Sequence, residues 1–98
     1  MAFKFEWDPR KAELNKTKHG VSFEQAITVW DDPRNLDIED VAHSQVESRL
    51  IRIGWSDKAI LVVVYTKRDL HLVRIISARK ASHKERRLYR ETNQKDRL

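Results

Sequence analysis

The chain has 98 residues and no cysteine, and 36% of its residues are charged. This length fits one domain with a single modest core, and the lack of cysteine excludes disulfides and thiolate catalysis. Residues 1–6 do not resemble a signal peptide, and the longest apolar run, residues 59–65, is too short to cross a membrane. We therefore expect a cytoplasmic protein that makes no contact with a membrane.

The formal net charge of +5 is unevenly distributed along the chain. Residues 67–98 contain eleven Lys or Arg against four Asp or Glu, a net of +7, whereas residues 1–66 contain nine against eleven, a net of −2. Clustered cations displace counterions from phosphates and speed encounters with polyanions. The asymmetry favours a nucleic acid or an acidic protein as partner; a solvated helix face is the plain alternative.

The first twenty residues predict a short strand followed by a helix. Phe3 and Phe5 alternate with polar residues, which is typical of a strand. Asp8 can cap a helix over residues 9–18, because the proline that comes next needs no hydrogen-bond acceptor in the first helical turn. Gly20 can take the left-handed conformation that ends such a helix.

A second helix is predicted from residue 22 to the Asp-Asp-Pro sequence at residues 31–33. Ser22 and Gln25 have the spacing of a capping box, in which each side chain satisfies a backbone N–H of the first turn. Apolar residues then recur at intervals of three and four, which places them on one face of a helix: Phe23, Ala26, Ile27 and Trp30.

Beyond residue 33 the pattern becomes extended. Four segments predict strands: residues 35–39, where the pattern is weakest, 49–55, 59–66 and 71–78. Residues 59–66 are apolar on both faces, as expected of a central strand. The short polar connections between the last three segments fit antiparallel neighbours.

Ser82 and Glu85 form a second capping-box pattern and predict a basic helix over residues 83–92. Residues 93–98 are expected to be a frayed basic tail, so that residues 1–92 form a single domain. The predicted fold is an α+β domain: an antiparallel sheet of about four strands, two N-terminal helices packed on it, and a basic C-terminal helix.

Several stretches of the sequence resemble the BrnT family of toxins. Residues 5–9 read Phe-Glu-Trp-Asp-Pro, residues 15–23 read Asn-Lys-Thr-Lys-His-Gly-Val-Ser-Phe, and residues 74–81 read Arg-Ile-Ile-Ser-Ala-Arg-Lys-Ala. Four further residues match the middle strand of that family: Glu47, Arg49, Ile53 and Gly54. The resemblance extends to about residue 91. It departs at Trp30, where a smaller aromatic residue is expected.

The resemblance implies a RelE-like fold and a ribonuclease toxin of a type II toxin–antitoxin system, which inhibits translation. It also implies neutralisation by a BrnA-like ribbon-helix-helix antitoxin, through which alone operator DNA would be bound. RNA is the implied substrate, and the ribosome is a further partner that the resemblance allows. No cofactor is implied.

Metal-independent cleavage of RNA needs cations that stabilise the charge on the phosphorane, and Arg74 and Arg79 are our candidates. Strict alternation along the strand places these two arginines on opposite faces, so a bulge or the end of the strand must intervene if both serve one site. The structural alternative is that one of them pairs with a carboxylate such as Glu47 or Glu85.

His19 is the candidate for acid–base catalysis, because imidazole titrates near neutral pH and Gly20 follows it at a helix end. The alternative is a helix-terminal histidine that satisfies the last carbonyls. The other histidines lack partners at ligand spacing, so we predict no metal site. Five cations are predicted to contact RNA: Lys18, Arg49, Lys67, Arg68 and Lys80.

Two other classes of function remain open. A non-enzymatic module could use the same basic face to hold nucleic acid or an acidic protein, and the sequence shows no tight acid–base constellation that argues against it. A structural subunit could have its exposed sheet edge completed by a partner. Tyr65 and Tyr89 could stack on RNA bases, but their positions favour packing.

Overall fold

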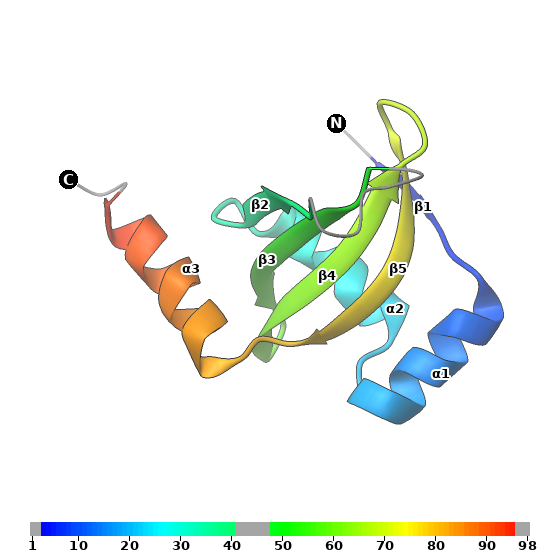
Figure 1. Cartoon of the computed structure of the whole chain (residues 1–98), viewed down its shortest axis with the longest axis horizontal. Helices are drawn as coiled ribbons and strands as arrows, with labels where there is room; N and C mark the ends of the chain where they lie inside the picture. Colours follow the sequence, from blue (N-terminus) through cyan, green and yellow to red (C-terminus); the bar gives the residue numbers. More distant parts are fainter. Residues whose placement is uncertain (1–2, 41–47, 96–98) are drawn as a thin grey trace.

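The computed structural model describes residues 3–40 and 48–95, with side chains up to residue 93. In this part of the chain a five-stranded mixed sheet has helices on both faces, which confirms the α+β class (Figure 1). The elements run in the order β1 (Lys4–Glu6), α1 (Pro9–His19), α2 (Phe23–Ala26), the 3-10 helix η1 (Ile27–Asp31), β2 (Leu36–Glu39), β3 (Leu50–Ser56), β4 (Ala59–Lys67), β5 (Leu72–Lys80) and α3 (His83–Lys95). None of these helices is long and apolar enough to span a membrane.

The sheet differs from the predicted one in the role of its first strand. The strand order is β1-β5-β4-β3-β2, and β1 pairs with β5 in parallel while all other pairs are antiparallel. The prediction of about four antiparallel strands is therefore wrong in detail. Periodicity identifies a strand but not its neighbour, and α1, α2 and the meander separate β1 from β5 in the sequence.

The first helix forms as predicted, and it ends one residue later. Asp8 Oδ1 accepts a hydrogen bond of 2.8 Å from the Arg10 N–H, and Gly20 closes the helix with φ 70°. Asn15 is buried and binds the free edge of β5 beyond the end of β1. Its Nδ2 donates to the Ala78 carbonyl at 2.8 Å, and its Oδ1 accepts from the Ala78 N–H at 3.1 Å.

The second predicted helix is divided into α2 and η1. Ser22 Oγ caps it as expected, accepting from the Gln25 N–H at 3.0 Å. The Gln25 carbonyl then accepts hydrogen bonds from the hydroxyls of Thr28, at 2.7 Å, and Ser56, at 3.3 Å. These hydroxyls compete for the carbonyl that an α-helix would pair with the amide four residues on, and the chain tightens into a 3-10 turn.

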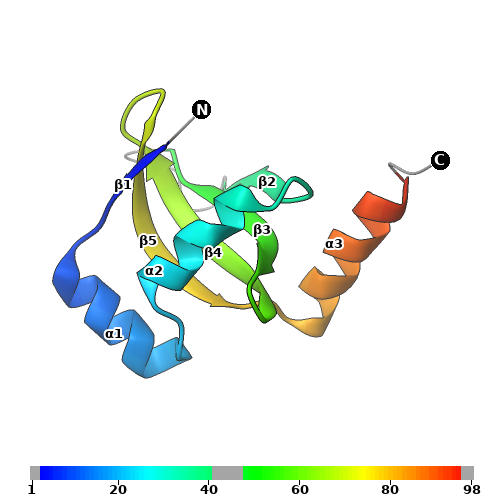
Figure 2. The same ribbon diagram turned by 180° about the vertical axis from the view of Figure 1, so that it is seen from behind.

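Two apolar clusters lie on the two faces of the sheet. We call the face covered by α1, α2 and η1 the helical face, and the opposite one the open face (Figure 2). The cluster on the helical face is the larger, with buried side chains that include Phe23, Leu61 and Tyr65. The cluster on the open face contains Ile53, Ile60, Val62 and Ala81, with Tyr89 of α3 packed against it.

Polar contacts hold α3 against the open face. Tyr89 Oη donates to Asp32 Oδ2 at 2.6 Å, and the same oxygen accepts from the Trp55 N–H at 2.7 Å. Asn93 Nδ2 donates to the Arg34 carbonyl at 3.3 Å. The helix continues to Lys95, three residues beyond its predicted end, and residues 96–98 of the predicted tail lie outside the described residues.

Candidate functional site

A β-bulge in β5 determines which side chains share the open face. Tyr65 pairs with Ile75 whereas Val64 pairs with Ser77, so Ile76 is an extra residue on β5. Ile75 and Ala78, three positions apart, are consequently both buried on the helical face. The bulge therefore reverses the alternation that would have separated Arg74 from Arg79.

Both arginines lie on the open face as a result. Arg74 pairs in register with Thr66, and Arg79 pairs with Val62, whose side chain belongs to the open-face cluster. Ser77 lies between the two arginines along the strand and is half-buried. Strict alternation required a bulge or the end of the strand between Arg74 and Arg79 if both were to serve one site, and the structure has such a bulge.

Arg79 is held by a carboxylate of α3. Its two terminal nitrogens donate to Glu85 Oε1 and Oε2 at 2.7 and 2.8 Å. These hydrogen bonds are the main reason that the pKa of Glu85 falls to about 2, and they raise the pKa of Arg79. Glu85 is thus ionised at neutral pH and is a weak proton acceptor, while the Arg79 side chain remains 44% exposed.

Glu85 has a second role at the start of α3. Its Oε1 accepts from the Ser82 N–H at 2.8 Å, while Ser82 Oγ accepts from the Glu85 N–H at 3.2 Å. This is the reciprocal capping box that the sequence predicts. The same carboxylate therefore joins the first turn of α3 to the guanidinium of β5.

Arg74 is held from the other side of β5, by the first strand. Because Glu6 of β1 lies in register with Arg74, Arg74 Nη1 donates to Glu6 Oε2 at 2.8 Å. Arg68 Nε lies 3.8 Å from the same oxygen. Two guanidinium groups thus lie within 3.8 Å of one carboxylate oxygen.

The structural alternative is therefore correct for both arginines. Glu85 pairs with Arg79 as one of the two carboxylates considered, while Glu47 lies outside the described residues. The Glu6–Arg74 pair was missed, because it depends on the parallel pairing of β1 with β5. A bidentate pair occupies one edge of a guanidinium, so the remaining donors of Arg79 can still meet a phosphate.

His19 does not join the two arginines. It ends α1, which packs on the helical face, and within residues 3–40 and 48–95 it makes no hydrogen bond or ion pair with Arg74 or Arg79. The three proposed catalytic residues are therefore not one constellation. His19 is half-buried and follows the Asn15 contact with β5 by one helical turn.

The predicted RNA-binding cations are spread over several parts of the molecule. Lys18 is exposed near the end of α1, and Lys67 and Lys80 are the exposed last residues of β4 and β5. Arg49 directly precedes β3, and its carbonyl accepts from the Asp40 N–H. Arg68 contacts the pair formed with Arg74, through Glu6.

Arg52 and the two tyrosines have structural roles. Arg52 lies over the ring of Trp30, 4.6 Å from its centre, and pairs with Asp37 at 3.1 Å. Tyr65 Oη donates to Asp37 Oδ1 at 2.6 Å, and burial together with this contact raises its pKa. Burial and the contact with Asp32 raise the pKa of Tyr89 to about 12. Both tyrosines are packed, as the sequence favours.

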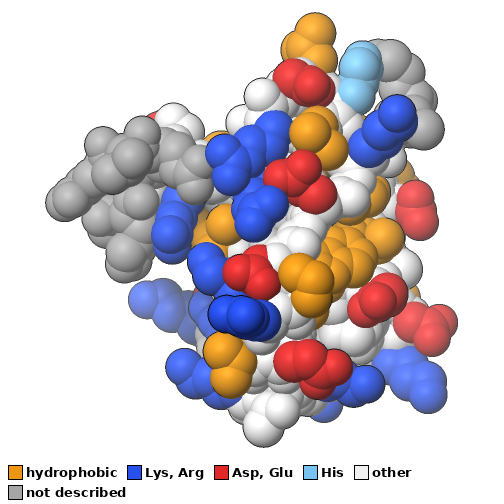
Figure 3. Space-filling model, turned by 90° about the vertical axis from the view of Figure 1, so that its right-hand side faces the viewer, with side chains coloured by type: hydrophobic (Ala, Val, Ile, Leu, Met, Phe, Trp, Pro, Cys, Tyr) orange, Lys and Arg blue, Asp and Glu red, His pale blue; other side chains and the backbone are white. Residues whose placement is uncertain are grey.

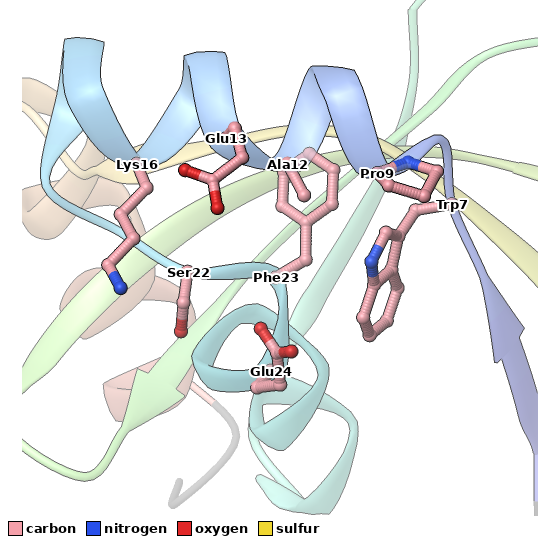
Figure 4. Close-up of a pocket in the computed structure, with 8 residues that line it drawn as sticks. All are labelled: Trp7, Pro9, Ala12, Glu13, Lys16, Ser22, Phe23 and Glu24. Carbon is pink, nitrogen blue, oxygen red and sulfur yellow. The ribbon is translucent and has the colours of Figure 1, made fainter.

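The two sides of the sheet also differ in surface character. In the view of Figure 3, Lys and Arg side chains gather along the left, while a hydrophobic patch with Asp and Glu beside it lies on the right, with further Lys and Arg side chains above and below it. A pocket of about 260 Å³ lies between α1 and α2 (Figure 4). Glu13 and Lys16 project into it from α1, opposite Ser22 and Glu24, and Trp7 closes one end.

This pocket holds none of the predicted catalytic residues. It contains two carboxylates but neither histidine nor arginine. Among the residues described, no group of three or more His, Cys, Asp or Glu side chains could hold a metal ion. The arginines of the open face therefore remain the best candidates for contact with a polyanion.

Comparison with known proteins identifies the family. The family model described as the ribonuclease toxin BrnT of type II toxin–antitoxin systems matches residues 7–85, which include Arg74, Arg79 and Glu85. A crystal structure of the ribonuclease toxin BrnT from Brucella abortus superposes with a TM-score of 0.66 at 25% identity, covering 84% of this chain and 100% of that one. A search of curated protein sequences gave no significant match. The chain belongs to the BrnT family of ribonuclease toxins of type II toxin–antitoxin systems.

Proposed function

We propose that RNA binds along β5 on the open face and is cleaved there by a metal-independent reaction, in which Arg74 and Arg79 contact the phosphates. The observation that carries this proposal is the bulge at Ile76, which gives both arginines the same face. Cleavage of messenger RNA by this toxin would inhibit translation.

The two arginines contact different phosphates of one strand. Five residues of extended chain separate their Cα atoms by roughly 15 Å. Their side chains also turn apart, Arg74 toward Glu6 of β1 and Arg79 toward Glu85 of α3. Between them Ser77 offers a hydroxyl that can donate to a further phosphate oxygen. This arrangement suits a strand that runs along β5 better than a single phosphate gripped by both arginines.

Arg79 is the group that stabilises the transition state. In the cleavage step the 2′-oxygen loses its proton to a base and bonds to the adjacent phosphorus, and the bond from phosphorus to the 5′-oxygen breaks as that oxygen takes up a proton. Negative charge builds on the phosphorane oxygens in between, and a fixed guanidinium lowers the energy of that charge. Glu85 positions Arg79 by holding two of its N–H groups. Because the pKa of Glu85 is about 2, this carboxylate supplies position more than proton transfer.

His19 would supply the acid–base step only if RNA passes around the free edge of β5, because Asn15 holds α1 at Ala78, the residue before Arg79, and His19 lies one helical turn further on. That edge is open beyond Arg74, where β1 ends, and the Asn15 contact brings α1 to it. Lys18 and Lys80 are exposed near the same end of β5 and would contact the backbone of this RNA; Arg49, Lys67 and Arg68 would contact more distant parts of it.

The test is cleavage of single-stranded RNA by the purified protein in EDTA. Arg79→Lys keeps a cation beside Glu85 but loses the planar pair of donors of the guanidinium. Because loss of one donor to the transition state typically lowers kcat by about 10²–10³-fold, we expect a decrease of that size. Lys58→Arg, in the turn between β3 and β4, is the matched control, with the reverse exchange of cations. Unchanged cleavage by Arg79→Lys would remove Arg79 from the mechanism, and activity abolished by EDTA would exclude a metal-independent reaction.

A binding module without chemistry is the second candidate. The observation in its favour is that both arginines are already paired with carboxylates and that, among the described residues, no histidine forms a hydrogen bond with either of them. Such a module would bind RNA in a salt-dependent manner and form no products.

The partner that we propose is a BrnA-like ribbon-helix-helix antitoxin, which would neutralise the toxin and bind operator DNA for the complex. The family supports an antitoxin partner in general. Purification of the chain together with the product of the adjacent reading frame, followed by the cleavage assay, tests it. The ribosome is a further proposed partner, because the toxin is proposed to act in the cytoplasm. The test compares the cleavage of free messenger RNA with that of messenger RNA being translated by ribosomes.

A further inference from the structure

An apolar groove lies on the helical side of the sheet, opposite the face that holds the arginines. Its volume is about 350 Å³, and it lies beside β1. Phe5 and Trp30 form its floor, with ring centres 5.1 Å apart, while Phe3, at one end, is 38% exposed. Ile27 completes the apolar lining. Apolar surface gathered in a groove is typical of a site that another molecule covers.

Carboxylates border this groove. Glu24 and Asp31 line it, both are exposed, and neither makes a hydrogen bond or an ion pair within the described residues. Glu24 also lines the pocket between α1 and α2, where Glu13 adds a third carboxylate and Lys16 is the lone cation (Figure 4). The groove itself is lined by the carboxylates of Glu24 and Asp31 and, among the described residues, by no Lys, Arg or His, so it attracts cations.

The edge of the sheet next to the groove is free to pair. β1 is the terminal strand in the described sheet. The Lys4 N–H donates to the His71 carbonyl of the neighbouring chain segment at 2.7 Å. Since successive residues of a strand point their amides in opposite directions, the N–H and carbonyl of Phe5 face away from β5. An extended segment could add there as a sixth strand.

We propose that this acidic aromatic groove docks an extended segment of the antitoxin in which Lys or Arg alternates with large apolar residues. The apolar side chains would enter between Phe3, Phe5 and Trp30, and the cations would meet Glu24 and Asp31. The identity of the partner rests on the proposed function. The groove lies on the helical side of the sheet, so docking there tethers the antitoxin while another part of it covers the arginines.

The test reverses the charge of the groove without touching its apolar floor. The double variant Glu24→Lys, Asp31→Lys is titrated with the purified product of the adjacent reading frame, and the affinity is measured by isothermal titration calorimetry at low and high salt. The matched control is Asp57→Lys, Glu91→Lys, which makes the same change of net charge on exposed residues elsewhere. We expect the affinity of the groove variant to fall at least tenfold, that of the control to stay within twofold, and cleavage of RNA by both variants alone to be unchanged.

The remaining outcomes are equally decisive. Equal affinities of the two double variants, or no binding of the adjacent product to the unaltered chain, would overturn the docking proposal. If the unaltered chain self-associates and only the groove variant is monomeric, the groove binds a second copy of this chain. That result would overturn the proposal that it binds the antitoxin. An unaltered chain that binds its partner but leaves RNA intact would contradict the proposed cleavage mechanism and leave the docking result standing.

Discussion

The two faces of the sheet are stabilised in different ways. On the helical face, α1 and α2 cover a cluster that includes Phe23, Leu61 and Tyr65, all fully buried. On the open face the buried cluster is smaller, and α3 is held mainly by polar contacts at Glu85, Tyr89 and Asn93. The comparison shows how so small a protein can keep an exposed, charged face: burial on one side stabilises the sheet, and directed hydrogen bonds position the groups on the other.

The largest effect should come from a truncation on the helical face. Leu61→Ala removes a fully buried side chain and should lower the free energy of unfolding by about 2–5 kcal/mol. The matched variant on the open face is Ile51→Ala in β3, which is only partly buried and should cost about 1 kcal/mol. Urea unfolding followed by tryptophan fluorescence measures both, and equal losses would refute the contrast between the faces.

A smaller loss is expected at the polar junction between α1 and β5. Asn15→Ala leaves the Ala78 N–H and carbonyl without their partner, and the Val21 carbonyl loses its 2.9 Å hydrogen bond. Unsatisfied buried groups of this kind should lower the free energy of unfolding by about 2–3 kcal/mol. Leu14→Ala, at the neighbouring 69% exposed position, is the control. Hydrogen exchange at the Ala78 amide should accelerate only in the Asn15 variant.

The helical face was the easier of the two to predict from the sequence. The cap at Asp8, the left-handed Gly20 and the central strand over residues 59–66 all depend on local patterns, and the structure confirms them. The break between α2 and η1 was not foreseen, because it requires the Ser56 hydroxyl to reach the Gln25 carbonyl from a distant strand.

The open face was harder to predict because its geometry depends on contacts far apart in the sequence. The bulge at Ile76 and the parallel register of Glu6 with Arg74 have no local signature, yet they decide which cations share a face. Glu85 was foreseen as a capping residue, because Ser82 lies at the required spacing, and it was one of the two carboxylates considered as a partner for an arginine. The separation of His19 from the arginines follows from the packing of α1, which periodicity does not determine.

The hydrogen bond between Tyr89 and Asp32 should contribute less to the free energy of unfolding than the buried side chains of Leu61 and Asn15. Tyr89→Phe keeps the ring against the open-face cluster and removes the 2.6 Å hydrogen bond, so we expect a loss of about 1 kcal/mol. Hydrogen exchange in the second half of α3 should rise, while exchange in α1 stays the same. Leu88→Ala, at a 43% exposed position beside Tyr89, controls for a general loosening of the helix. Unchanged exchange in α3 would show that the hydroxyl does not hold the helix.

The smallest expected effect is the change with pH in the contribution of the Arg79–Glu85 pair to the stability of the fold. The folded protein lowers the pKa of Glu85 from 4.5 to about 2, so the pair stabilises the fold above pH 4.5 and loses that stabilisation as the pH falls from 4.5 toward 2. Because Arg79 is 44% exposed and screened by water, the contribution should stay below about 1 kcal/mol. Glu85→Gln should therefore lower Tm slightly at pH 7 and much less at pH 2, where about half of the Glu85 carboxylates are protonated.

The control is Glu91→Gln, which removes the same charge from an exposed position of the same helix. Its effect on Tm should be the same at both pH values. Suppose instead that Glu85→Gln lowered Tm equally at pH 7 and pH 2. The ion pair would not explain that loss, because it depends on pH. The capping hydrogen bond from the Ser82 N–H would not explain it either, because the amide oxygen of glutamine also accepts that bond. Such a result would mean that Arg79 is not held by Glu85 in solution, and the open face would then owe its arrangement to Tyr89 and Asn93 alone.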